Sequence, residues 1–218
     1  MPAWGTQRNW RWCNKCQGLW FGPNREQSDC PQGGRHSRDG SGNYRLPIVT
    51  SHVRVHTKIL TSPDVPLTTV FQNMREVYAT VNIDVEWATE ETLNLPALNV
   101  VDVGQCLLGQ TTNEQNQLFN NRNFASADDI VVYFVLATDP PFNGCAAHPP
   151  GSPSAVVARP ATQWTFAHET GHVLDLIHVN NNDRLMTGNG TANITNPPPD
   201  LDAAEGTTMQ ASPLTVNV

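Results

Sequence analysis

Residues 168–172 read His-Glu-Thr-Gly-His, which is the pattern H-E-x-x-H. Residues four apart on a helix project on the same side, so His168 and His172 can both direct a ring nitrogen to one Zn²⁺ ion. Glu169 would then lie beside the metal, where its carboxylate can take a proton from a metal-bound water. This spacing predicts metal-assisted hydrolysis. Matches of five residues also arise by chance, so the neighbouring residues have to be considered too.

Two residues farther along the chain extend the pattern. His178 lies ten positions after His168, and Met186 follows in the sequence Leu-Met-Thr. Residues 168–187 therefore resemble the motif of metzincin zinc peptidases, H-E-x-x-H-x-x-G-x-x-H followed by a Met-turn. In order of elements the resemblance covers roughly residues 48–218. It implies His168, His172 and His178 as ligands of a catalytic zinc, Glu169 as general base and Met186 beneath the metal.

The sequence departs from this motif at Asp175, where the family has a glycine. That glycine lets the chain turn with positive φ at the end of the active-site helix. Asp enters the left-handed region more readily than most other non-Gly residues, so the same turn is possible here. If the helix continued instead, Asp175 would share a face with His172 and could be the third ligand or accept an imidazole N–H. We favour His178 as the third ligand.

The resemblance also implies a mechanism. Zinc held by three neutral imidazoles keeps one position open for water and polarises the substrate carbonyl. Glu169 takes the proton of that water and later delivers it to the leaving amine. Some metzincins add a tyrosine just after the Met-turn, but Thr187 stands there in this chain and no tyrosine follows Tyr133. The transition state must therefore be stabilised without that tyrosine.

We therefore predict a zinc-dependent endopeptidase. Two other functions fit the same residues: a binding or toxin-associated protein with a latent or inactive peptidase-like domain, and a zinc hydrolase of a non-peptide amide. The retained Glu169 argues against the first, because a decayed site has no chemical need for that carboxylate. The sequence does not separate the second from a peptidase.

A second set of metal-ligand residue types lies near the N-terminus. Cys13 and Cys16 form a C-x₂-C pair, Cys30 follows after thirteen intervening residues, and His36 comes next. This set suits a structural Zn²⁺, which a segment of about 40 residues without a long hydrophobic pattern would need in order to fold. The alternative is a disulfide between two of the cysteines with one thiol free. In that case Cys30 could act as a latency switch on the catalytic metal.

Several large aromatic side chains surround these cysteines. We expect Trp10, Trp12, Trp20 and Phe21 to pack around the metal, although a platform for a glycan or a protein is an alternative. The segment is similar to Trp- and Gly-rich Cys segments attached to microbial secreted proteins. Residues 33–43 predict turns and loop. A boundary after residue 46 would separate a Cys-rich module, 1–46, from the catalytic domain, 47–218.

The catalytic domain shows alternating strand and helix patterns. Strands are predicted at 49–60, 81–89, 129–138 and 154–158, and helices at 66–80, 113–120, 161–176 and 201–211. This order gives an α+β fold with an α/β-type catalytic domain. The resemblance adds a twisted mixed sheet with an active-site helix and a C-terminal helix. In the first strand we expect Val53 and Val55 on the buried face and His52, Arg54 and His56 on the other.

Two further features concern the region before the active-site helix. Residues 154–158, bracketed by prolines, predict a short edge strand. The resemblance implies that substrate pairs with such an edge as an extended strand. Cys106 and Cys145 form either a disulfide, which would contribute a few kcal/mol, or two buried thiols.

Composition limits the partners. The 218 residues carry a net charge of −7 and no basic stripe, which argues against a nucleic-acid binder. The longest apolar run, residues 130–137, is too short to cross a membrane. We expect a monomer that acts on a protein or peptide substrate. Residues 1–7 contain no apolar run typical of a signal peptide, and we expect a secreted or extracellular protein.

Overall fold

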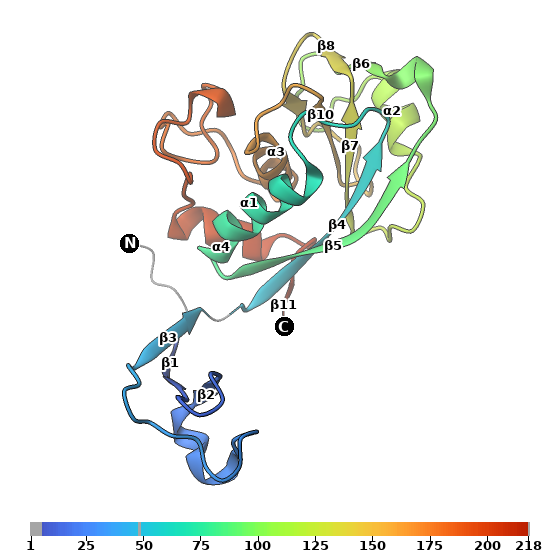
Figure 1. Ribbon diagram of the computed structural model, residues 1–218. Helices are drawn as coiled ribbons and strands as arrows, with labels where there is room; N and C mark the ends of the chain where they lie inside the picture. The colour runs from blue at the N-terminus through green and yellow to red at the C-terminus, as the bar shows by residue number, and fades with distance from the viewer. Residues whose placement is uncertain (1–5, 48, 218) are drawn as a thin grey trace. The chain divides into compact units, whose positions relative to one another are not determined.

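The computed structural model describes residues 6–47 and 49–217 (Figure 1). The chain divides into two compact units, residues 3–49 and 50–218, three residues after the boundary expected from the sequence. In the part that the structure describes, none of the helices is long and apolar enough to cross a membrane.

The N-terminal unit is a small antiparallel sheet with long turns. Its elements are β1 (Thr6–Trp12), β2 (Leu19–Phe21), β3 (Tyr44–Pro47) and the 3-10 helix η1 (Gly22–Gln27), with strand order β2-β1-β3. The seven-residue strand β1 was not predicted, because a register shift between Gln7 and Trp10 interrupts its alternation and Asn9 has φ 73°. Among the described residues of this unit, the buried hydrophobic cluster consists of Cys13, Trp20 and Cys30, with Cys16 packed against it. That is a very small core for a folded unit.

The second unit is built on a twisted mixed sheet. Its strands are β4 (Ser51–Ile59), β5 (Ile83–Thr92), β7 (Ile130–Val135), β9 (Gly144–Cys145), β10 (Ser154–Ala158) and β11 (Val216–Asn217). The order is β5-β4-β7-β10-β9; the first four strands are parallel and β9 is antiparallel to β10. Strand β11 pairs antiparallel with the start of β4. The result is a mixed sheet of four parallel strands and two short antiparallel ones, β9 and β11.

The predicted edge strand at 154–158 is an interior strand. β10 lies between β7 and β9, and all five of its residues are buried. The flanking prolines lie outside the strand, and the carbonyl of Pro153 even accepts a hydrogen bond from the backbone N–H of Val131 (3.0 Å). The edge is β9, whose two residues give no periodic signal in the sequence.

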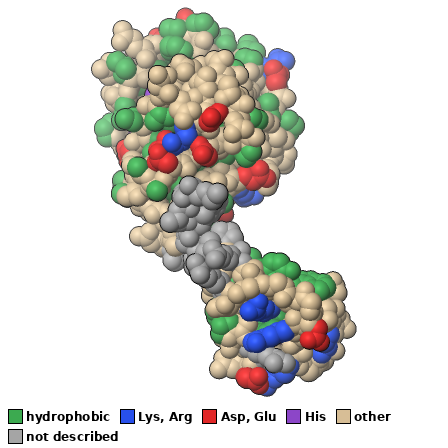
Figure 2. All heavy atoms as spheres, turned by 90° about the vertical axis from the view of Figure 1, so that its left-hand side faces the viewer, with side chains coloured by type: hydrophobic (Ala, Val, Ile, Leu, Met, Phe, Trp, Pro, Cys, Tyr) green, Lys and Arg blue, Asp and Glu red, His purple; other side chains and the backbone are tan. Residues whose placement is uncertain are grey.

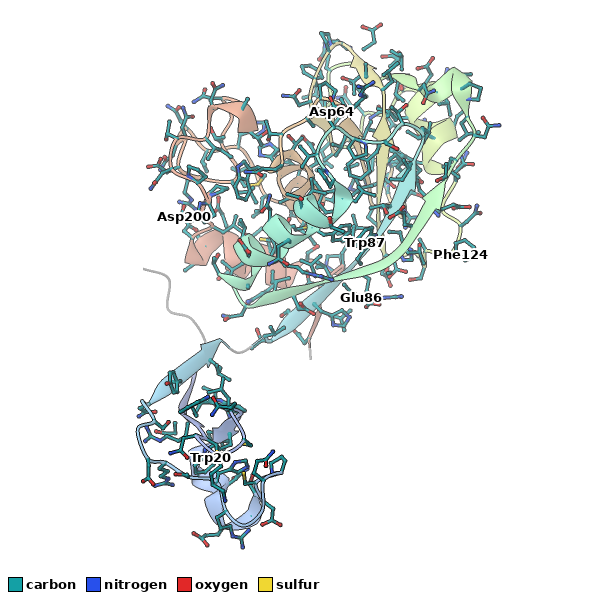
Figure 3. All side chains as sticks on the ribbon, viewed as in Figure 1. Trp20, Asp64, Glu86, Trp87, Phe124 and Asp200 are labelled. Atoms are coloured by element: carbon teal, nitrogen blue, oxygen red, sulfur yellow. A yellow bond between two sulfur atoms is a disulfide. The ribbon has the colours of Figure 1, made fainter. Side chains whose placement is uncertain are left out.

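One face of this sheet is covered by α1 (Leu67–Ala79) and α3 (Thr165–Val173). Helix α1 buries its apolar residues at the steps of three and four seen in the sequence: Val70, Phe71, Met74, Val77 and Tyr78. Phe71 stacks on Trp87 of β5 with ring centroids 4.4 Å apart. Trp87 is labelled in Figure 3. The hydroxyl of Tyr78 donates to the carbonyl of Ala167 (2.8 Å), which joins α1 to α3. The C-terminal helix α4 (Ala203–Ala211) lies within one residue or two of its expected bounds.

The opposite face is covered by α2 (Asn113–Phe119) and by the paired strands β6 (Val100–Asp102) and β8 (Ala137–Asp139). The predicted strand at 129–138 is therefore two strands. The break falls at Leu136, where the backbone N–H groups of Leu136 and Ala137 both donate to the carbonyl of Asn99. The apolar run continues through this break, so hydrophobicity alone does not reveal it.

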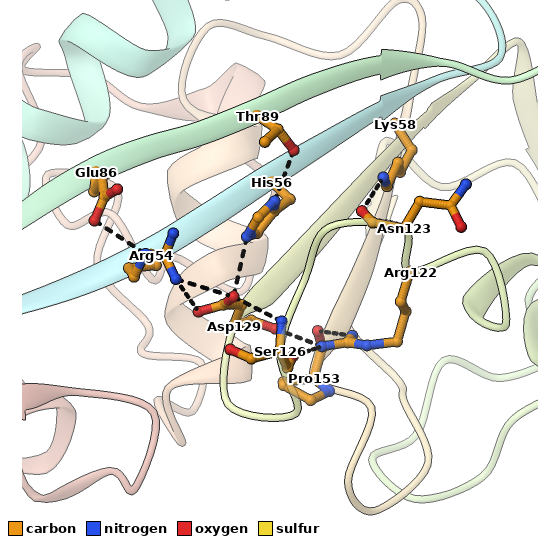
Figure 4. Close-up of polar contacts among 10 residues, drawn as sticks. All are labelled: Arg54, His56, Lys58, Glu86, Thr89, Arg122, Asn123, Ser126, Asp129 and Pro153. Atoms are coloured by element: carbon orange, nitrogen blue, oxygen red, sulfur yellow. Dashed lines mark hydrogen bonds and ion pairs between the residues drawn. The ribbon is translucent and has the colours of Figure 1, made fainter.

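His56 and Lys58 of β4 are buried although they are polar, because this second face is covered. His56, expected on a solvent-facing side, is fully buried: its Nε2 lies 3.1 Å from Asp129 Oδ2 and its Nδ1 2.7 Å from Thr89 Oγ1 (Figure 4). Burial lowers the pKa of His56, so the neutral ring donates to the carboxylate and accepts from the hydroxyl. Arg54 completes the cluster by binding Asp129.

The two units differ in charge. Seven of the 13 Lys and Arg residues lie within residues 1–49, but only three of the 20 Asp and Glu residues do. Figure 2 shows Lys and Arg side chains on the visible face of the N-terminal unit. The net charge of the whole chain therefore conceals a basic unit and a strongly acidic one.

Candidate metal centre

Helix α3 carries the H-E-x-x-H residues and ends soon after them. It ends at Val173, three residues before the expected end. The N–H of Leu176 donates to the carbonyl of Gly171 and that of Asp175 to His172, both at 3.0 Å, which is the Schellman arrangement. Asp175 has φ 69°, the left-handed conformation considered possible from the sequence. The chain therefore turns sharply at Asp175.

This turn decides where the residues after the helix lie. Ile177, two residues after the turn, is 79% exposed. His178 returns to the two histidines of the helix. Its Nε2 lies 3.2 Å from that of His168 and 3.0 Å from that of His172, and the latter two are 3.1 Å apart.

The three distances fit a tetrahedral metal ion. With Zn–N bonds of about 2.0–2.1 Å, ligand nitrogens of a tetrahedral site are separated by about 3.3 Å. Nδ1 of His168 lies 2.7 Å from the carbonyl oxygen of Leu185, and Nδ1 of His172 lies 2.8 Å from that of Leu176. A carbonyl only accepts, so both protons are on Nδ1 and both neutral rings face each other with unprotonated Nε2 atoms. A cation between them satisfies these lone pairs.

Burial keeps these rings neutral. It lowers the pKa of His168 to about 3, an effect that the neighbouring imidazoles increase, and it lowers that of His172 to about 4. Burial also lowers the pKa of His178. Neutral imidazole is the form that binds a metal.

Asp175 lies outside this cluster. In the described part of the chain, the histidines 168, 172 and 178 form a group whose ligand atoms all lie within 4.8 Å of one another, and Asp175 is not in it. Its exposed side chain lines the neighbouring cavity instead. The geometry therefore favours His178 over Asp175 as the third ligand.

Glu169 is held against the edge strand. Its side chain is buried, and burial raises its pKa to about 8. A Cβ atom at Gly144 of β9 would lie 2.5 Å from Cγ and Oε1 of Glu169, so any larger residue there would force one of the two to move. Sequence reasoning did not identify Gly144, because a glycine in a two-residue strand carries no pattern.

Met186 supports the helix from below. It is fully buried, and a Cβ atom at Gly171 would lie 2.7 Å from its Sδ. Its carbonyl accepts from the N–H of Val179 (2.8 Å), so the Met-containing turn is bonded to the segment that carries His178. Gly171, between the two helical histidines, is therefore the point at which the helix and this turn meet.

A cavity of about 530 Å³ opens in front of the histidines. Glu169, His172 and His178 line one part of it, and exposed apolar side chains line another: Leu107, Leu108, Phe142 and Ile177. A disulfide between Cys106 and Cys145 joins the loop with the two leucines to β9. No periodic pattern in the sequence indicates these apolar loop residues.

The N-terminal candidates also come together. Cys13, Cys16, Cys30 and His36 place one ligand atom each within 4.8 Å of all the others, and the three cysteines are free. Cys30 thus belongs to this cluster in the structure.

Comparison with known proteins supports the fold. No protein-family model matches the sequence, and neither does a curated protein. Among solved structures, metalloproteinase-II from Bacteroides fragilis is similar, with a TM-score of 0.55 and 17% identity over 74% of this chain. The chain spans 53% of that protein's length. Archaemetzincin from Methanopyrus kandleri matches with a TM-score of 0.47 and 13% identity, over 74% of this chain and 95% of that one. The likeness to the metalloproteinase confirms the predicted fold class, an α+β fold with a twisted mixed sheet.

Proposed function

We propose that residues 50–218 form a zinc-dependent endopeptidase of the metzincin type. The observation that carries the proposal is the convergence of three histidine Nε2 atoms, at 3.0–3.2 Å from one another, beside a buried glutamate at a cavity. His168, His172 and His178 would hold the metal. When bound, zinc would supply Lewis-acid activation of water and of the substrate carbonyl.

The residues of this chain supply the proton transfer and the rigidity. The carboxylate of Glu169 would take a proton from the attacking water and deliver it to the leaving amine nitrogen. The carbonyls of Leu185 and Leu176 hold two of the imidazole rings in orientation and tautomer. Thr187 does not take the place of the family's tyrosine, because it is fully buried and its hydroxyl donates to Asn182 Oδ1 (2.9 Å).

The edge strand β9 supports a polypeptide substrate. It lies beside Glu169, and residues 144, 146 and 147 line the cavity. An extended peptide can add to such an edge through main-chain hydrogen bonds. Pairing of this kind requires neither end of the peptide, which favours cleavage within a chain.

The disulfide favours an extracellular location. Bonds such as that between Cys106 and Cys145 persist in oxidising compartments and are rare in the cytosol. We therefore include secretion in the proposal.

Incubation of the zinc-loaded chain with a diverse peptide mixture, followed by mass spectrometry, tests the function. We expect internal cuts that disappear in Glu169→Ala. A folded, zinc-loaded protein that makes no cuts would overturn the active-peptidase proposal in favour of a binding protein with a peptidase fold. Hydrolysis of small non-peptide amides alone would identify the other type of zinc hydrolase.

A further inference from the structure

Four side chains of the N-terminal unit meet at distances suited to a metal ion. Sγ of Cys13 lies 3.9 Å from Sγ of Cys30, and Sγ of Cys16 lies 3.6 Å from Nδ1 of His36. A tetrahedral zinc with bonds of about 2.3 Å to sulfur and 2.0–2.1 Å to nitrogen separates two sulfurs by about 3.8 Å and a sulfur from a nitrogen by about 3.6 Å. Both measured separations agree with these values.

We propose that Cys13, Cys16, Cys30 and His36 bind a structural zinc ion that holds the N-terminal unit folded. The inference is independent of the proposed peptidase activity, since it concerns other residues in a separate unit.

Two tight turns deliver the cysteines. At the first, the N–H of Cys13 donates to the carbonyl of Gly18, and the carbonyl of Cys13 accepts from Gln17, both at 2.9 Å. At the second, the N–H of Cys30 donates to Gly34 (2.7 Å) and its carbonyl accepts from Gly33 (2.8 Å). Each turn contains residues with positive φ: Gln17 in the first, Gly33 and Gly34 in the second. Two similar turns with a cysteine at the start of each form the paired knuckles of a small zinc site.

Neighbouring groups orient the ligands. The backbone N–H of Ser37 donates to Sγ of Cys13 (3.4 Å), a bond that favours the thiolate needed for metal binding. The ring of His36 stacks on Trp20, with centroids 5.2 Å apart and planes at 10°. The guanidinium of Arg38 covers the same indole at 5.5 Å from its centroid. His36 is therefore held in the position of a fourth ligand.

Burial and ligand number indicate a structural role. Cys13, Cys30 and His36 are 0%, 4% and 7% exposed, and Cys16 is partly buried. Four protein ligands complete a tetrahedral shell and leave no position for a substrate. Among its described residues, the unit buries little apolar surface besides Trp20 and these sulfurs. A metal therefore supplies the stabilisation that the core does not.

The zinc content of the full chain, purified without chelator, tests the proposal. We expect two zinc ions per chain in the wild type, one in the double variant Cys13→Ser/Cys30→Ser, and one in His168→Ala/His172→Ala. Glu26→Ala, an exposed residue of η1, should keep both. A Cys13→Ser/Cys30→Ser variant with as much zinc as the wild type would overturn the proposal. A single zinc in the wild type, lost in the cysteine variant but kept in the histidine variant, would instead mean that only the histidine centre fails to bind metal.

Two measurements on the unaltered sequence keep the test informative if a variant does not fold. Cobalt in place of zinc should give thiolate-to-metal charge-transfer absorption, which a centre with histidine ligands alone does not produce. All three thiols should resist alkylation until a strong chelator is added. A disulfide among Cys13, Cys16 and Cys30 in the native protein, found by peptide mass spectrometry, would overturn the proposal.

Discussion

The two clusters of metal-ligand residues are equally compact, but they differ in the number of ligands and in access from solvent. The histidine cluster has three members and borders a cavity of about 530 Å³, with Glu169 beside it. The N-terminal cluster has four members, three of them sulfurs, and is largely buried. The number of ligands and the access to the site are the basis on which we propose a catalytic role for the histidine cluster and a structural role for the N-terminal one.

Removal of metal should separate the two clusters most strongly. A chelator of moderate strength should take the ion from the three-ligand centre first, because that ion is exposed to the cavity and has no thiolate ligand. We expect peptide cleavage to fall to background as one zinc per chain is lost, and to return when zinc is added back. Simultaneous loss of both zinc ions, or cleavage that persists after the first zinc is lost, would contradict this distinction between the two clusters.

The next largest effect is expected from Glu169→Gln, which keeps the shape of the side chain but removes the base. Cleavage should fall about 10²–10⁴-fold, the usual contribution of general acid–base catalysis. Zinc content should stay at the wild-type value, because Glu169 is not in the histidine cluster. Glu90→Gln, at an exposed position in β5, is the matched control and should leave kcat/KM unchanged. A variant that keeps more than a tenth of the activity would argue against the proposed base.

Gly144→Ala tests the contact between the edge strand and the glutamate. The added Cβ would lie 2.5 Å from Glu169 Cγ, so the carboxylate has to move. A displacement of about 1 Å at a reacting group costs about 10²-fold in rate. We expect kcat/KM to fall by about that factor with zinc content and circular dichroism unchanged. Unaltered kinetics would show that the strand yields instead.

The smallest effect is expected at Asp175, where the conformation matters more than the side chain. Asp175→Gly should keep both zinc ions and the activity, and should raise the free energy of unfolding by up to about 1 kcal/mol, because glycine adopts positive φ without strain. Asp175→Val should lower it by about 1–2 kcal/mol. Urea unfolding and zinc analysis measure both. A loss of one zinc in the glycine variant would identify Asp175 as a ligand.

The elements with a regular side-chain period could be predicted from the sequence. In α1 the apolar residues that recur at steps of three and four are the buried ones. Helices α2 and α4 lie close to their predicted bounds. Helix α3 was predicted too long at both ends: it begins at Thr165, four residues after the predicted start, and it ends at Val173 although apolar residues continue past the Schellman turn. The helix ends because Asp175 has a positive φ. An aspartate in a sequence predicts a positive φ much less strongly than a glycine does.

What the sequence could not show depends on contacts between distant segments. The burial of His56 follows from α2 and β6 covering the second face of the sheet. The position of the edge strand follows from which strand pairs with β10, and the two residues of β9 carry no period. In the site, residue types and spacing predicted the histidines. Gly144 and the apolar cavity wall can be identified only from the three-dimensional structure.

The turn at Asp175 also bears on how such a site can change in evolution. The codons of glycine that end in a pyrimidine are one nucleotide away from those of aspartate, and those of aspartate are one nucleotide away from those of asparagine. These three residues are the ones that tolerate positive φ best. A lineage can therefore pass among them at this position by single substitutions while the third histidine keeps its place. A search pattern that insists on glycine passes over every chain that has taken such a step.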